Sequence, residues 1–304
     1  MSELLTIKVS EEKYDEIKEY YRPFFIKENE NYIDYVAKKN QVLITGFLSS
    51  KKMKSVTFQG EYVQKEVDIW GIEVQKKKEN TLKDASWLDV HTQIGSDEVG
   101  VGDLFLPMIV VASYVTSSQI KELKKIGITD SKKLTDQKII EIAPLVIQKY
   151  KFSKLTLSNE KYNQMILRGE NINSLKAKMH NRALRNLYQV FDNVKNIYID
   201  QFVNEEKYYS YLTKFDEPIL RNVTFKTKGE SYYPSIALAS VVARYYLLTE
   251  KHKLERKYNK TFPFGAGMDA DGFLDELYKE IGKEELEKLI KINFKNYKKY
   301  LSNQ

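Results

Sequence analysis

The sequence predicts an α/β protein, α+β when the whole chain is considered, in which a mixed sheet flanked by helices follows a small N-terminal α+β domain. Three observations lead to this prediction. The chain has 304 residues, more than one typical domain. A polar, charged stretch without periodicity, residues 75–86, interrupts the patterned segments. After this stretch, two strand patterns precede alternating helix and strand patterns, as expected for a sheet with helices on its faces.

The N-terminal part is expected to form a strand, a helix and a small antiparallel sheet. Residues 4–9 read as a short strand, and an amphipathic helix begins after Ser10 and ends near Tyr21, before Pro23. Later strands are expected at 41–48, 55–59 and 67–74. These patterns place the first domain at residues 1–75, a linker at 76–88 and the second domain, with C-terminal helices, at 89–304.

The second domain alternates between the two periodicities. Strands are expected at 92–98, 106–115, 152–157, 196–201 and 223–226. Helices are expected at 135–149, 173–191 and 235–249. Pro144 should kink or shorten the first of these helices, whereas Pro234 suits the first turn of the last one.

The composition excludes several functional classes. The chain contains no Cys and three His, so it cannot form disulfides, thiolate zinc sites or a cysteine nucleophile, and a histidine-built metal site has little material. The N-terminus has acids where a signal peptide needs basic and apolar stretches, and no apolar run is long enough to span a membrane. We therefore expect a cytoplasmic protein without membrane contact, and a monomer by default.

The charge distribution favours a polyanionic partner. The net charge is +7, and residues 1–84 contribute nothing to it, because they hold fifteen Lys or Arg and fifteen Asp or Glu. Even so, no acid occurs between Tyr35 and Gly60. This acid-free segment carries Lys38, Lys39, Lys51, Lys52 and Lys54.

Four acids stand at strand ends, where ligands bind in open sheets. Asp97 and Glu98 close one strand before Val-Gly-Val-Gly, Asp200 closes another, and Glu230 follows a third. A single acid at such a place is more often a cap or turn residue, but the joint occurrence favours a metal site. Clustered carboxylates repel one another unless a cation lies between them, and all-oxygen ligands select Mg²⁺ or Mn²⁺. Two such ions could activate a water and stabilise the leaving oxygen of a phosphodiester.

Five further segments, in order, reinforce the first acidic motif. The first motif lies in Gly95–Asp103 (GSDEVGVGD), and the five further segments are Asp130–Leu134 (DSKKL), Ile199–Phe202 (IDQF), Lys228–Ser231 (KGES), Pro234–Arg244 (PSIALASVVAR) and Pro263–Gly267 (PFGAG). Over residues 90–270 the chain resembles the type 2 ribonucleases H, and ribonuclease HIII in particular. Glu230 in the last acidic position is the ribonuclease HIII pattern, since ribonuclease HII has Asp there.

The resemblance implies a ribonuclease H-like domain that cleaves the RNA strand of RNA/DNA hybrids and leaves 3′-hydroxyl and 5′-phosphate ends. It assigns two Mg²⁺ or Mn²⁺ ions to Asp97, Glu98, Asp200 and Glu230. It also implies that the N-terminal domain resembles the TATA-binding protein fold and holds the hybrid.

Substrate contacts are expected in three places. The first is the loop of Gly100, Val101 and Gly102, where Val101 departs from the usual Gly-Thr-Gly, so that readout of the 2′-hydroxyl would rest on backbone amides. The second is Ser131, Lys132 and Lys133, and the third is Lys51, Lys52 and Lys54. His180 is expected to be hydrogen-bonded rather than catalytic.

Two alternatives stay open. One is nicking at single ribonucleotides in duplex DNA, as ribonuclease HII does, although the N-terminal extension, Glu230 and the missing Gly-Arg-Gly argue against it. The other is a non-catalytic protein that binds RNA/DNA hybrids. The four intact acids argue against this one, because they weaken binding of a polyanion unless metal ions fill the site.

Overall fold

The computed structural model describes residues 3–30, 32–48, 53–72, 87–128, 134–213 and 217–302. The chain divides into two compact units, Met1–Asp84 and Ala85–Gln304. Most of the linker expected at 76–88 lies outside the described residues.

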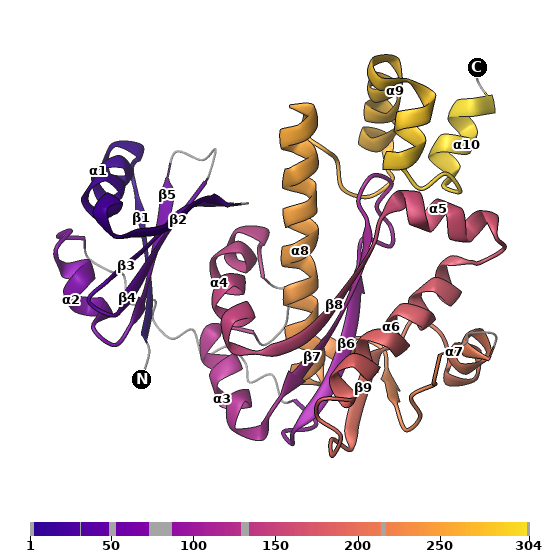
Figure 1. Ribbon diagram of the computed structural model, residues 1–304, viewed down its shortest axis with the longest axis horizontal. Helices are drawn as coiled ribbons and strands as arrows, with labels where there is room; N and C mark the ends of the chain where they lie inside the picture. Colours follow the sequence, from indigo (N-terminus) through magenta and orange to yellow (C-terminus); the bar gives the residue numbers. More distant parts are fainter. Residues whose placement is uncertain are drawn as a thin grey trace. The chain divides into compact units, whose positions relative to one another are not determined.

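The first unit is a five-stranded antiparallel sheet with α1 and α2 on one face (Figure 1). The strand order is β1-β5-β4-β3-β2. Its elements are β1 (Glu3–Val9), α1 (Glu11–Tyr21), the 3₁₀ turn η1 (Arg22–Phe24), β2 (Phe25–Glu30), β3 (Ile33–Lys39), β4 (Val42–Phe47), β5 (Lys54–Gly60) and α2 (Val63–Asp68). Ser10 caps α1 by accepting a hydrogen bond from Lys13 N. Alternate residues of the strands, such as Ile7 and Val56, form the core beneath the helices.

One expectation for this unit was wrong, and two strands were not predicted. The strand expected at 67–74 is replaced over its first residues by α2, because Val63 and Val67 lie one helical turn apart and both pack into the core. Residues 25–39 form β2 and β3, which the sequence pattern did not predict. β2 is an edge strand, and among the described strands it pairs with β3 alone. Its sequence, FIKENE, is therefore free to be polar.

The second unit contains a five-stranded mixed sheet in the order β10-β9-β6-β7-β8. β6 pairs antiparallel with β7 and parallel with β9. The elements are β6 (Gln93–Val99), β7 (Met108–Val115), α3 (Ser117–Ile126), α4 (Asp136–Lys149), β8 (Lys151–Leu157), α5 (Asn159–Leu167), α6 (Ile172–Tyr188), β9 (Asn196–Asp200), α7 (Glu205–Leu212), β10 (Thr224–Lys226), the 3₁₀ turn η3 (Gly229–Ser231), α8 (Pro234–Tyr258), α9 (Met268–Leu289) and α10 (Lys295–Ser302).

Helices α6 and α8 cover opposite faces of this sheet (Figure 1). Successive residues of β6 show the two faces. A side chain added at Gly95 would touch α8, whereas the Ser96 hydroxyl binds His180 of α6. The two acids that follow in β6 therefore meet different helices.

The predicted fold class, a mixed sheet flanked by helices after a small α+β unit, is confirmed. Thr135 caps α4, and Pro144 does not end this helix, which continues to Lys149 around the buried Ile142 and Val146. α8 is longer than expected. It ends at Tyr258 and is capped by Asn259, which has a left-handed conformation (φ 52°) and donates its N–H to Glu255 O.

Candidate active site

The parallel pairing of β6 with β9 brings two of the four acids side by side. Ser96 lies opposite Ile199 in the register, and continuing it by one residue places Asp97 opposite Asp200. The close approach of α8 to β6 requires a glycine two residues before Asp97. A Cβ on Gly95 would lie 2.7 Å from the backbone nitrogen of Ile236 in α8.

The surroundings of Asp97 disfavour the charged form of its carboxyl group. Its side chain faces α8, where Ser240 donates a hydrogen bond to it, and the residue is 8% exposed. Burial raises the pKa of Asp97 well above its usual range, and the negative charges of Glu98 and Asp200 raise it further. The hydrogen bonds from Ser240 and from Glu98 N oppose this rise.

Glu98 faces α6, and its surroundings favour the charged form of its carboxyl group. Its Oε2 lies 2.8 Å from His180 Nε2, and its Oε1 forms an ion pair with Lys176 Nζ. Burial raises the pKa of Glu98, but the contacts with His180 and Lys176 outweigh it and leave the pKa lowered. His180 is itself fully buried and binds Ser96 Oγ through Nδ1 at 2.8 Å. It is hydrogen-bonded, as expected, and its contacts hold Glu98 as a carboxylate.

Asp200 and Glu230 lie on adjacent segments. β10 pairs in parallel with β9, and Lys226 lies opposite Asp200. The chain then turns through η3, where Gly229 N donates to Asp200 Oδ1 at 2.8 Å. Glu230 is the next residue and is 1% exposed.

The loop after β6 has a fixed shape. Gly100 adopts a left-handed conformation with φ of 81°, and a Cβ there would lie 2.0 Å from Pro107 O. The Val101 side chain packs against the cluster of Met108, Tyr162 and Leu175. Gly102 is exposed, and a Cβ on it would meet nothing within 4 Å. An apolar residue at 101 is therefore compatible with this loop.

A hollow of about 270 Å³ opens beside Glu98. Ser240 and Arg244 of α8 line it together with Asp136, the first residue of α4. Arg244 binds Asp136 through two parallel hydrogen bonds of 2.8 and 2.9 Å. The predicted substrate residues Ser131, Lys132 and Lys133 precede α4 in the chain, but they lie outside the described residues.

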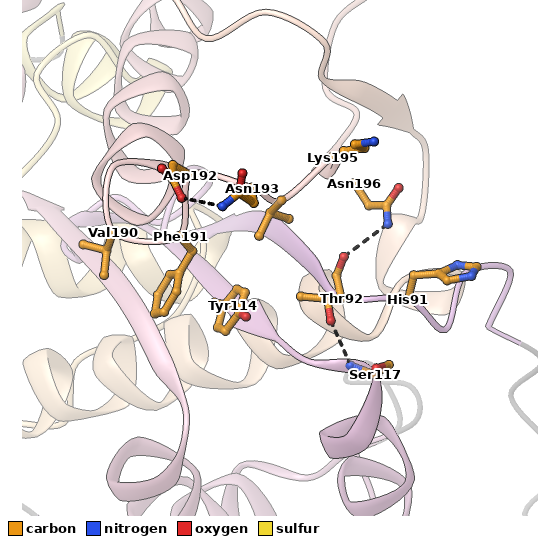
Figure 2. Close-up of a pocket in the computed structure, with 11 residues that line it drawn as sticks. His91, Thr92, Tyr114, Ser117, Val190, Phe191, Asp192, Asn193, Lys195 and Asn196 are labelled. Atoms are coloured by element: carbon orange, nitrogen blue, oxygen red, sulfur yellow. Dashed lines mark hydrogen bonds between the residues drawn. The ribbon is translucent and has the colours of Figure 1, made fainter.

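A larger hollow of about 610 Å³ lies at the opposite end of the strands (Figure 2). His91 and Thr92 before β6, Tyr114 of β7 and Asn196 of β9 line it. Among the described residues of this lining, Asp192 is the one carboxylate, and it accepts a hydrogen bond from Asn193 Nδ2 at 3.0 Å. This hollow therefore does not belong to the acidic site.

Of the three lysines predicted as substrate contacts in the first unit, the structure describes Lys54. Lys51 and Lys52 lie outside the described residues. Lys54 Nζ lies 3.3 Å from Glu11 Oε1 of α1, on the face that the helices cover. The other face of the sheet carries Lys8 and Lys38, with Thr6 and Thr57 joined through their hydroxyl oxygens at 3.1 Å.

The four carboxylates are gathered but do not converge on one point. Within the part of the chain that the structure describes, no three Asp, Glu or His side chains already form a metal-ligand group. Glu98 is turned toward α6, and Asp200 Oδ1 accepts the Gly229 N–H. The set offers only oxygen ligands, which suits Mg²⁺ or Mn²⁺. Burial and, after it, the charges of Glu98 and Asp200 raise the pKa of Asp97, and a cation would relieve the repulsion among these carboxylates.

The sequence pattern missed the residues that surround the four acids. Lys176, Ser240 and Arg244 all lie within segments quoted above for other reasons, yet their roles follow only from the packing of α6 and α8 on β6.

None of the described helices has the combination of length and apolar character that crossing a membrane requires.

Two family descriptions match the chain. The family described as Ribonuclease HII matches residues 94–297, and the Domain of unknown function (DUF3378) matches residues 5–83. The chain is 36% identical to ribonuclease HIII of Bacillus mycoides (strain KBAB4) and 35% identical to that of Bacillus cereus (strain AH187). Both alignments span 309 positions and cover 98% of each chain.

Solved structures agree with these matches. The crystal structure of Bst-RNase HIII in complex with Mn²⁺ is similar, with a TM-score of 0.68, 30% identity and 99% of both chains covered. The crystal structure of Aquifex aeolicus RNase H3 has a TM-score of 0.53 at 21% identity and covers 95% of this chain and 99% of its own, a likeness in fold alone.

Proposed function

The chain belongs to the ribonuclease HIII family, and on that premise we propose that it is a metal-dependent endoribonuclease that hydrolyses the RNA strand of RNA/DNA hybrids. The observation that carries the proposal is the gathering of Asp97, Glu98, Asp200 and Glu230 at the ends of β6 and β9 and just after β10. The products would carry 3′-hydroxyl and 5′-phosphate ends.

The four carboxylates would hold two Mg²⁺ or Mn²⁺ ions. A relative whose structure contains Mn²⁺ supports this choice, as does the all-oxygen donor set. Two such ions, when bound, supply activation of a water and stabilisation of the leaving oxygen. Asp97 and Asp200, which lie side by side, would share the ions, while Glu98 and Glu230 would each complete the ligands of one.

The neighbouring residues would prepare these ligands. Lys176 and His180 keep Glu98 ionised, so that it can bind a cation without first losing a proton. Ser240 donates a hydrogen bond to Asp97 and favours its ionised form as well. The bond from Gly229 N orients the Asp200 carboxylate.

The test is divalent-dependent cleavage of two labelled duplexes, one with a continuous RNA strand on DNA and one with a single ribonucleotide in DNA. We expect cleavage of the first with Mg²⁺ or Mn²⁺ and none in EDTA. Efficient nicking of the second would assign ribonuclease HII-like behaviour. Hybrid binding without cleavage of either duplex would assign a non-catalytic role.

A pair of matched variants tests the site. Asp97→Asn should lower turnover by more than about a hundredfold, because it removes a metal ligand. It should also diminish the rise in Tm that saturating Mn²⁺ produces. Asp192→Asn, at the opposite end of the sheet, should change neither quantity (Figure 2). Full activity of Asp97→Asn would overturn the assignment.

We further propose that the first unit holds the hybrid, with Lys8 and Lys38 on the sheet face away from the helices as phosphate contacts. Removing residues 1–84 should weaken hybrid binding more than it lowers the saturated rate, and unchanged binding would give this unit another role. Its resemblance to the TATA-binding protein fold stays a prediction, as do a monomeric state and a cytoplasmic location. Sedimentation of the purified chain tests the monomeric state.

A further inference from the structure

A buried lysine near the C-terminus binds the loop that follows the two adjacent acids. Lys291 comes two residues after α9, and its side chain is fully buried. Its Nζ donates hydrogen bonds to Gly100 O at 2.9 Å, to Asp103 O at 2.5 Å and to Leu106 O. An ammonium group has three donors and no acceptor, so each proton meets one carbonyl oxygen.

The charge of this group is necessary for the arrangement. A neutral amine has only two N–H donors and would leave one of the three buried carbonyls without this partner. Burial lowers the pKa of Lys291 to about 7, and the charge of Asp103 acts in the opposite direction. Burying an ammonium group costs free energy, whereas an apolar side chain could fill the same space without that cost. Its presence here therefore indicates a role that an apolar side chain could not have.

That task follows from the geometry of the peptide bond. The C=O and N–H of a trans peptide point in opposite directions, and the described residues contain no cis peptide bond. Because Gly100 O points at Lys291, the N–H of Val101 points away from it. The partly buried Val101 side chain packs against the cluster of Met108, Tyr162 and Leu175, and Gly102 is exposed. The loop therefore offers backbone donors, and not a side chain, at its exposed turn.

Three other hydrogen bonds hold the same loop. Asp103 accepts a hydrogen bond from Gly265 N, and Leu104 N donates to Gly265 O at 3.0 Å. The backbone N–H of Lys291 donates to Leu104 O at 3.0 Å. Residues 100–106 are thus held by hydrogen bonds from two C-terminal segments, and Lys291 supplies those on the buried side.

We propose that Lys291 is a positioning residue for strand selection. It holds residues 100–106 so that the backbone amides around Val101 and Gly102 can bind a ribose 2′-hydroxyl, the group that distinguishes RNA from DNA. This proposal rests on the proposed function, since it assumes that the loop meets the RNA strand.

The test compares Lys291→Met with the control Lys288→Met in the full-length protein. Lys288 lies on α9, has a half-exposed side chain and forms a surface ion pair with Glu284. Each variant is given two labelled hybrids that are identical except for a 2′-deoxynucleotide on the 5′ side of one scissile phosphate. The readout is the selectivity, the ratio of kcat/KM for cutting that position in the two hybrids.

Lys291→Met should lower this selectivity about tenfold, the effect of one well-placed hydrogen bond. Lys288→Met should leave it unchanged. A merely structural role would lower cutting of both hybrids equally, and an unchanged selectivity in Lys291→Met would overturn the proposal. If the wild-type protein cuts neither hybrid, the proposed function fails instead.

A second measurement needs no variant and applies if Lys291→Met does not fold. The ¹⁵Nζ resonance of Lys291 in the wild-type protein is followed by NMR while the hybrid is added in Ca²⁺ to suppress cleavage. A ligand bound to the Val101 N–H changes the polarisation of the peptide group whose carbonyl, Gly100 O, accepts from Lys291 Nζ. We therefore expect the Lys291 resonance to shift and the Lys288 resonance to stay unchanged. No shift at saturating hybrid would overturn the proposal.

Discussion

Gly95→Ala tests how closely the acid-bearing strand must approach α8. A Cβ at this position would lie 2.3 Å from Ser235 Oγ and 2.7 Å from Ile236 N. These atoms cannot easily move. Ser235 Oγ and N both donate to Gln93 Oε1, at 2.8 and 3.2 Å, and Ser235 O accepts from Ser113 Oγ at 2.6 Å. The added methyl group must therefore push β6 and α8 apart.

The expected loss of stability is large for one methyl group. Overpacking a core typically destabilises by about 1–3 kcal/mol, and we expect the upper end because the contacts involve backbone and a fixed hydroxyl group. For a unit of this size, about 3 kcal/mol corresponds to a fall in Tm of roughly 6–12 °C. Turnover should fall further than the unfolded fraction explains, because Asp97 moves relative to Ser240 and Asp200.

The assay is thermal unfolding followed by circular dichroism, with Gly102→Ala as the matched control. A Cβ on Gly102 meets nothing within 4 Å, so this control should stay within about 0.5 kcal/mol of wild type. Ser235→Ala removes one of the clashing atoms, so it should cost less in the Gly95→Ala background, with a coupling of at least about 0.5 kcal/mol. A fall in Tm no larger than that of Gly102→Ala would refute the reasoning.

Three further predictions concern charge. In metal-free protein, Asp97→Asn should raise Tm at neutral pH. The folded pKa of Asp97 lies above its unfolded value, so its contribution to stability is present at low pH and is lost as the pH rises through the folded pKa. For Lys291 the folded pKa of about 7 lies below the ordinary 10.5, so the unfolding free energy in urea should gain up to about 5 kcal/mol between these pH values. Lys291→Met should lose that gain. Replacing Lys8 and Lys38 by Gln should reduce the salt slope of hybrid binding by about 2, whereas Lys65→Gln on α2 should not change it.

Each of these predictions has an outcome that contradicts it. A lower Tm for Asp97→Asn would mean that the carboxylate is stabilised rather than strained. The same pH dependence in Lys291→Met and wild type would mean that the lysine does not titrate between pH 7 and 10.5. An unchanged salt slope would remove Lys8 and Lys38 from the phosphate contacts.

The elements that the sequence predicted are those whose local pattern agrees with their tertiary environment. α1 has a cap at Ser10 and an apolar stripe, and β7 is a continuous apolar run, so each could be identified from neighbouring residues alone. β2 and α2 could not. One is a polar edge strand and the other a short helix, and in both the environment rather than the pattern decides the structure.

The sequence by itself also determined the residue types of the site, four carboxylates at strand ends next to glycines, because metal chemistry restricts those types. Only the tertiary structure decided what surrounds them. Asp97 and Glu98 are neighbours in the chain, yet the pleat of β6 turns one to α8 and the other to Lys176 and His180 of α6, with opposite effects on their pKa values. Nothing in the local sequence separates Lys291 from the exposed Lys288. Its role depends on three carbonyls from a loop remote in the chain, and long-range packing alone brings such groups together.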